Sequence, residues 1–342
     1  MMRRAFLAIL LVIISLGSSR AATPFQQLRG VIHLDTTVSG GDYEPEEMVR
    51  FLIDNDLEVA VFTDHDTVRW DYGFFPARWI MGWITGSLIG RAFGRTGSVQ
   101  TFGSRNYLAL LDELDQKYDK IVVIPGVESI PFFYWEGSFA GGNLAMVNGY
   151  KHLLAFGMSS GNDYEDLPSV GNGFHRGYGI QSLLSLWPLA LLFLGLRCRR
   201  SAREARLPFI YLGTAFLFLS VGSLFLLNNF PFKFGKYDQY AGDQGVSPYQ
   251  DLIDYVVDRG GLVFWAHPEV SVDRSVSRGP FKVGIRTESY HEDLLRTHNY
   301  TGFAAFAEGV KYVIPPGGIW DQVLGEYCNG ERANPVWAIA EG

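Results

Sequence analysis

Several short apolar runs of this chain end or begin at a side chain that could bind a metal ion. These side chains are His33, Asp64, His65, Glu128, His152 and His267. Continuous apolar runs are typical of parallel strands buried on both faces, so polar residues at their ends are expected at one edge of a sheet. Imidazole together with carboxylate suits Zn, Mn or Fe better than Ca. The pattern therefore predicts a metal site built from distant parts of the sequence.

The distribution of histidine supports this reading. A polar residue after one strand could simply begin a loop, but four of the seven histidines adjoin apolar runs. The other three, His175, His291 and His298, lie in polar or glycine-rich stretches and are predicted to be surface residues.

Helical patterns separate the apolar runs. Residues 44–57 place Met48, Val49, Leu52 and Ile53 on one face, and residues 104–118 are similar. A third helix is expected to begin with Ser247 as N-cap and to close at Gly260-Gly261. Alternating strands and helices indicate an α/β barrel or a doubly wound sheet. In a barrel, the carboxyl ends of the strands converge on one face, where active sites lie.

Five segments, in order, resemble the motifs of the polymerase and histidinol phosphatase (PHP) domain. They are His33-Leu34-Asp35-Thr36-Thr37, Thr63-Asp64-His65-Asp66, Pro125-Gly126-Val127-Glu128, His152-Leu153-Leu154 and Ala266-His267-Pro268. The resemblance implies an α/β fold, a distorted (β/α)7 PHP-type barrel, that holds two or three divalent ions (Zn, Mn or Fe) and hydrolyses phosphate esters. By position, it implies that the metal ligands are His33, Asp35, His65, Glu128, His152 and His267.

The resemblance also implies a catalytic role for His65 and for Asp64, with Asp64 either a metal ligand or a residue that orients one.

The sequence departs from the family's motifs in two places. Asp35 stands where the family has a second histidine, which would alter the metal preference. The family's last motif, Asp-x-His, is not found after the run Val336–Ala340, and the chain ends at Gly342. Either the sequence is a fragment that ends just before those ligands, which is the favoured expectation, or the protein lacks them.

The composition indicates that part of the chain lies in lipid. Of the 342 residues, 47% are hydrophobic and only 19% are charged. The formal net charge of -7 argues against nucleic acid as a partner. The two cysteines, Cys198 and Cys328, form neither a disulfide framework nor a zinc-finger spacing. The oligomeric state stays open.

Three apolar segments give one topology. Residues 1–22 resemble a signal peptide, or alternatively an uncleaved anchor. Residues 178–196 and 207–230 carry no charge and are long enough to cross a bilayer, with two buried core helices as the alternative. Five arginines in the loop 197–206 predict that this loop is cytoplasmic. Residues 178–230 would then be a transmembrane hairpin inserted between two parts of the barrel, 29–177 and 231–342, both on the extracytoplasmic side.

Residues 74–93 are ambiguous. Their apolar part is too short to span a bilayer. A helix in the membrane interface and a buried helix that caps the barrel are both open.

Three functions compete. The leading hypothesis is a membrane-anchored phosphoesterase acting on a small phosphorylated substrate. The chief alternative is a catalytically degenerate barrel that binds a ligand and signals through the hairpin, which the His33-x-Asp35 sequence favours. Hydrolysis at carbon, as in amidohydrolases, is a fold-level analogy only.

Overall fold

A computed structural model describes most of the chain. The described residues are 26–67, 72–73, 77–78, 80–82, 97–138, 141–170, 176–278, 281–306 and 308–340. The proposed signal or anchor segment 1–22, most of 74–93 and the last two residues lie outside this description.

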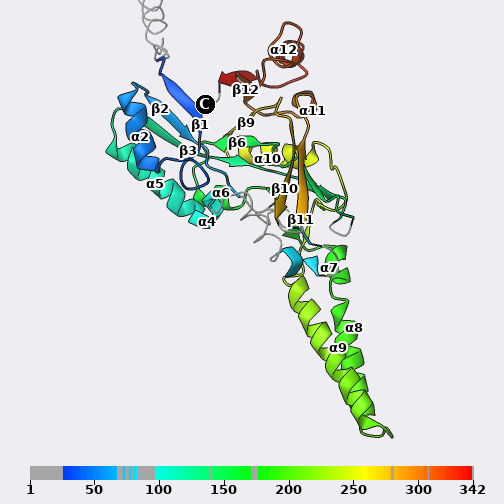
Figure 1. Ribbon diagram of the computed structural model, residues 1–342. Coiled ribbons are helices and arrows are strands. Elements are labelled where there is room, and N and C mark those ends of the chain that lie inside the picture. Colours follow the sequence, from blue (N-terminus) through cyan, green and yellow to red (C-terminus); the bar gives the residue numbers. More distant parts are fainter. Residues whose placement is uncertain are drawn as a thin grey trace, which may run out of the picture.

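The centre of the fold is a mixed sheet of seven strands. In spatial order these are β1 (Gly30–Leu34), β2 (Val59–Phe62), β3 (Val122–Ser129), β6 (Leu153–Phe156), β9 (Leu262–Trp265), β12 (Gly302–Phe306) and β13 (Trp337–Ala340). The sheet curves into a nearly closed, barrel-like layer (Figure 1). Within the described part of the chain, no ladder joins β13 back to β1.

One strand runs against the others, and this corrects the expectation of a parallel sheet. The pairs β1–β2, β2–β3, β9–β12 and β12–β13 are parallel. Strand β6 is antiparallel to both of its neighbours, β3 and β9. Its amino end therefore lies at the same edge as the carboxyl ends of the parallel strands. The apolar run at 153–156 did not reveal this, because burial on both faces looks the same in either direction.

Helices cover the sheet and form the core with it. They are α2 (Pro45–Asp54), α4 (Val99–Phe102), α5 (Ser104–Lys117), α6 (Gly161–Glu165), α10 (Ser247–Val257), α11 (Asp293–Arg296) and α12 (Ile319–Cys328). Val49 of α2, Leu111 of α5 and Leu252 of α10 are buried in one apolar cluster with Phe303 of β12. The N-cap of α10 is Val246, one residue before the expected Ser247.

A second sheet packs beside the first. Its order is β10 (Val272–Arg278), β11 (Phe281–Thr287), β5 (Ala145–Val147) and β4 (Tyr134–Glu136). It unites two insertions, one between β3 and β6 and the other between β9 and β12, around a separate apolar cluster that includes Trp135, Met146 and Ile285. No sequence pattern predicted this sheet.

Residues 178–230 form a helical hairpin that projects away from the body (Figure 1). It contains α7 (Ile180–Leu184), α8 (Pro188–Ser201) and α9 (Pro208–Asn229). Strands β7 (Arg176–Gly177) and β8 (Phe234–Gly235) pair at its base, so the chain enters and leaves at one place. Two helical stretches, Ser182–Ser201 and Pro208–Asn229, are long and apolar enough to cross a membrane.

The two long helices pack closely through glycines. A side chain at Gly195 would meet Leu219 at 2.8 Å, and one at Gly222 would meet Leu192 at 2.8 Å. Their outward faces expose large apolar residues, including Phe193, Phe209, Phe216 and Leu227. The expected loop 197–206 is partly helical, because α8 continues to Ser201. Cationic side chains are favourable in the last turn of a helix, where backbone carbonyls lack partners.

Candidate metal centre

Glu128 lies at the centre of the candidate site, and four imidazoles surround its carboxylate. Its Oε1 is 3.4 Å from His33 Nε2 and 3.2 Å from His267 Nε2, and it contacts His152 Nδ1. Its Oε2 is 3.2 Å from His65 Nδ1. Ligand atoms of His65, Glu128 and His152 all lie within 4.8 Å of one another, and all three residues are buried. The structure thus brings five predicted ligands together, namely His33, His65, Glu128, His152 and His267.

Each of the five lies in or next to a different strand of the central sheet. His33 lies near the carboxyl end of β1, His65 follows β2, Glu128 lies in β3, and His267 follows β9. His152 precedes β6, and the antiparallel course of that strand brings it to the same edge.

Gly126, two residues before Glu128, permits a close approach of strands β2, β3 and β6. A Cβ on Gly126 would lie 2.5 Å from the Cβ of Phe156 and 3.0 Å from the carbonyl oxygen of Phe62. At this point β3 exchanges its parallel pairing with β2 for antiparallel pairing with β6. Close packing between the strands therefore requires glycine at this position of the Pro-Gly-x-Glu segment.

Two of the histidines have unusual backbone conformations. His33 has a φ of 72° and forms a bulge in β1, where the register with β2 shifts between Ile32 and Leu34. His267 has a φ of 28° directly after β9. Positive φ is uncommon outside glycine and concentrates at functional sites, and bulges re-aim side chains. The backbone therefore deviates at the points where these imidazoles turn toward Glu128.

The charge state of the centre suits a cation. Burial alone raises the pKa of Glu128, but His152, His65 and His33 outweigh burial and hold this pKa well below its usual value. Burial lowers the pKa of His152, although Glu128 opposes this effect. Glu128 is thus charged while His152 favours its neutral form, which is the form that binds metals.

The hydrogen bonds of His152 point the same way. Its Nε2 is 3.2 Å from the carbonyl oxygen of Gly149, which can only accept, so Nε2 carries the ring proton. Nδ1 then presents a lone pair toward Glu128 and toward His267 Nε2, which is 3.2 Å away. A cation between these facing acceptors would remove the repulsion between them. The residues therefore fit a divalent ion with nitrogen and oxygen ligands.

Asp64 makes hydrogen bonds with the protein on both of its carboxylate oxygens. Oδ1 accepts from the Thr36 backbone N–H at 2.7 Å and from Ser39 Oγ at 2.8 Å, while Oδ2 accepts from Thr36 Oγ1 at 2.9 Å. Tyr107 of α5 also donates to Oδ2 at 3.0 Å. Burial raises the pKa of Tyr107 well above its usual value, so its hydroxyl keeps the proton that it donates. Asp64 therefore ties β2 to the loop after β1.

Asp35 and Asp66 lie beside these residues. Ser39 Oγ lies 3.3 Å from Asp35 Oδ1 and links Asp35 to Asp64. Asp66 accepts hydrogen bonds from Ser129 Oγ at 2.8 Å and from the Thr67 backbone at 2.6 Å. Burial raises the pKa of Asp66 to about 7.

Some residues of the site have no motif that could have revealed them. Tyr107 and Tyr290 reach the site from α5 and from the loop after β11, and only the tertiary fold brings them there. Among the predicted surface histidines, His298 is exposed, His291 is partly exposed and stacks on Tyr312, and His175 lies outside the described residues.

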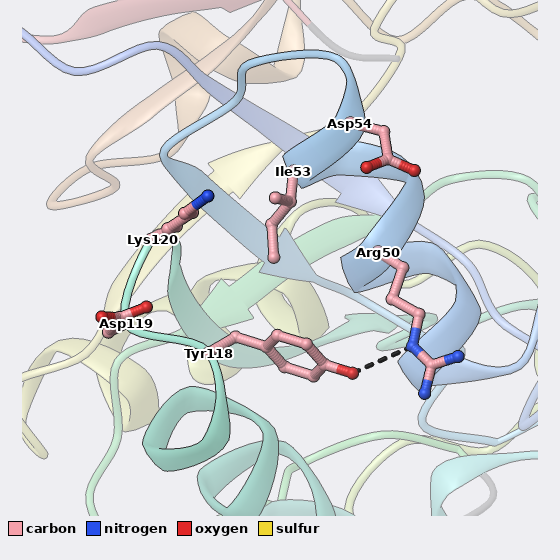
Figure 2. Close-up of a pocket in the computed structure, with 6 residues that line it drawn as sticks. All are labelled: Arg50, Ile53, Asp54, Tyr118, Asp119 and Lys120. Carbon is pink, nitrogen blue, oxygen red and sulfur yellow. Dashed lines mark hydrogen bonds between the residues drawn. The ribbon is translucent and has the colours of Figure 1, made fainter.

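A surface pocket elsewhere on the molecule is not part of this centre. It is lined by Arg50, Ile53, Asp54, Tyr118, Asp119 and Lys120 (Figure 2). These residues lie at the end of α2 and in the loop that precedes β3, whereas Glu128 lies near the other end of β3. The pocket is therefore at the opposite edge of the sheet from the imidazoles.

Comparisons with known proteins add little at the level of sequence. No family model matches the chain, and no curated protein matches it. One similar solved structure is that of a Bifidobacterium adolescentis protein named as a metal-dependent phosphoesterase. It is 15% identical, with a TM-score of 0.35 over 92% of this chain and 87% of that chain.

Proposed function

We propose that this chain is a membrane-anchored, metal-dependent phosphoesterase. The observation that carries the proposal is the buried carboxylate of Glu128 with four imidazoles around it. A buried carboxylate is costly unless it is paired, and a bound cation would pair with it while the imidazoles stay neutral. The order of the five motif segments along the chain supports the same reading.

The ligands proposed are His33, Asp35, His65, Glu128, His152 and His267, with two or three ions of Zn, Mn or Fe. When bound, such ions supply a hydroxide near neutral pH and neutralise charge on a phosphoryl group. His65 would act next to the reacting phosphate. Asp64 is better suited to positioning than to ligation, because its oxygens already hold Thr36, Ser39 and Tyr107. The proposed substrate is a small phosphorylated molecule.

Membrane anchoring is proposed for the hairpin. Large apolar side chains on its outward faces, such as Phe216 and Leu227, would meet lipid. Arginines gather at its tip, between the two long helices, and the body lies at its base. By the positive-inside rule the tip would face the cytoplasm and the metal centre would lie outside it.

The experiment is hydrolysis of p-nitrophenyl phosphate by the full chain in detergent. The protein is stripped with a chelator, and Zn, Mn or Fe is then added back. We expect metal to restore hydrolysis and His65→Ala to lower it by about 10-fold or more, because the site loses a ligand. His298→Ala removes an exposed imidazole outside the cluster and serves as the control.

The assay also separates the two main hypotheses. Metal binding without hydrolysis of phosphate esters would favour the alternative, a degenerate barrel that acts as a membrane ligand-binding protein. Metal-independent hydrolysis that His65→Ala leaves intact would contradict both.

A further inference from the structure

The hydroxyl of Tyr290 lies between the backbone and one imidazole of the centre. Its Oη is 2.6 Å from the carbonyl oxygen of Ala266 and 3.0 Å from His267 Nδ1. The backbone N–H of His152 points to the same oxygen at 3.4 Å. The phenol of Tyr290 therefore contacts both His152 and His267.

The position of Tyr290 is well determined by its surroundings. The residue is buried, and its ring packs against Trp265 with centroids 5.6 Å apart. Its backbone N–H donates to the carbonyl of Pro268 at 2.9 Å. The chain reaches this point after the β10–β11 insertion, so the second sheet delivers a side chain to the metal centre.

The hydrogen-bond chemistry assigns the protons. A phenol has one proton to donate, and the Ala266 carbonyl, at the shorter distance, can only accept it. The Tyr150 carbonyl, 3.4 Å from the same hydroxyl, is also an acceptor only. With its proton on a carbonyl, the Tyr290 oxygen can accept from His267 Nδ1, which places the ring proton of His267 on Nδ1. His267 Nε2 is left with a lone pair, and this is the nitrogen that lies 3.2 Å from Glu128 Oε1 and from His152 Nδ1.

Glu128 pulls the proton in the opposite direction. In the absence of a cation, its Oε1 would accept a proton from His267 Nε2. The tautomer of His267 is therefore a competition between the Tyr290 hydroxyl on one side of the ring and Glu128 on the other.

We propose that Tyr290 is a positioning residue that holds His267 in the tautomer whose Nε2 carries the lone pair that would bind metal. The proposal rests on the proposed metal centre for its purpose, but the tautomer itself is a property of the protein alone. Ligand histidines commonly have their second nitrogen fixed in this way, and loss of such a partner weakens metal binding.

The test compares Tyr290→Phe with Tyr300→Phe in the full chain. The first removes the hydroxyl and keeps the ring that packs on Trp265. The second is a matched control, because the Tyr300 hydroxyl is also buried and also donates to a backbone carbonyl, that of Leu294 at 2.8 Å, away from the imidazoles. Two quantities are measured: metal affinity by titration, and the tautomer of His267 by 15N NMR of metal-free, 15N-histidine-labelled protein. At about pH 8, imidazoles of ordinary pKa are neutral. The His267 signals are assigned with His267→Gln.

We expect the proton of His267 to lie on Nδ1 in the unaltered protein and to move toward Nε2 in Tyr290→Phe. Metal affinity should fall by about 10- to 100-fold in that variant. Tyr300→Phe should change neither quantity. A proton on Nε2 in the unaltered protein, or a Tyr290→Phe variant with unchanged tautomer and affinity, would overturn the proposal. If the unaltered protein binds no metal, the proposed function fails, while the NMR result still decides the role of Tyr290.

Discussion

The Nδ1 atom of His152 and the Nε2 atom of His267 lie 3.2 Å apart, because the neighbouring strands that they adjoin run in opposite directions. His152 comes just before β6 and His267 just after β9. In a wholly parallel sheet these two positions would lie at opposite edges. The reversal of β6 is therefore the topological feature that lets both imidazoles reach Glu128.

Gly126→Ala is expected to destabilise the protein by about 1–3 kcal/mol, as overpacking of a tight interior does. The added Cβ would lie 2.5 Å from the Cβ of Phe156, which belongs to the backbone-anchored part of β6 and cannot swing away. Thermal unfolding of the full chain in detergent measures the effect.

Gly325→Ala is the matched control for that substitution. Gly325 lies inside α12, and a Cβ there meets nothing within 4 Å. Alanine in place of a helical glycine should be neutral or stabilising by up to about 1 kcal/mol. Equal unfolding temperatures for the two variants would show that β3 does not need glycine at position 126, where it changes its partner from β2 to β6.

Much of the site could be predicted from the sequence, because the ligands adjoin apolar runs that had to be strands. His33, His65, Glu128, His152 and His267 were all named from that pattern, and the structure brings them together. The helix predicted at 104–118 corresponds to α5, which ends at Lys117. Local pattern suffices for these features, since burial fixes the strands and the apolar face, with Tyr107, Leu111 and Leu114 buried, fixes the helix.

Other features depend on contacts between distant segments. The direction of β6 leaves no trace in its four apolar residues. The bulge that aims His33 and the loop that delivers Tyr290 depend on pairing and packing across the fold. Asp64 was predicted as a ligand or an orienting residue, and only its partners Thr36, Ser39 and Tyr107 favour the second role.

Glu46 should make stability depend on pH in the acid range. On α2, it interacts with Lys117, Tyr118 and Arg50, which lower its pKa from 4.5 to about 2. Figure 2 shows the adjoining contact, in which Arg50 Nε donates to Tyr118 Oη at 2.9 Å. Because the folded pKa is below the unfolded one, the stabilisation is complete above pH 4.5 and is lost as the pH falls toward about 2.

Glu46→Gln tests this directly. The difference in unfolding free energy between the unaltered protein and the variant should be largest near neutral pH and should shrink as the pH falls below 4.5. Glu113→Gln, at an exposed position of α5, is the control for removal of a surface charge. A Glu46→Gln difference that stays constant from pH 7 to pH 3 would show that this group of contacts adds no pH-dependent stability.

The proposed topology can be tested with the two cysteines. Cys198 lies in α8 near the arginine-rich tip of the hairpin, and Cys328 is exposed at the end of α12 on the body. An impermeant thiol reagent added to intact cells should label Cys328 and leave Cys198 unlabelled until the cells are opened. Labelling of Cys198 from outside would contradict the proposed orientation of the hairpin or its insertion in the membrane, since about 30 Å of hydrocarbon should separate the two thiols. Cys198→Ser and Cys328→Ser variants identify which thiol has reacted.

The metal content of the purified full chain tests the central claim most directly. We expect elemental analysis after dialysis to find at least one equivalent of Zn, Mn or Fe per chain. We expect Glu128→Gln, which keeps the shape and removes the charge, to lose it. His267→Ala should weaken metal binding by about 10-fold or more while circular dichroism stays unchanged. His298→Ala should bind metal as the unaltered protein does. A chain that binds none of these metals at micromolar concentrations, or a Glu128→Gln variant that retains full occupancy, would contradict the account.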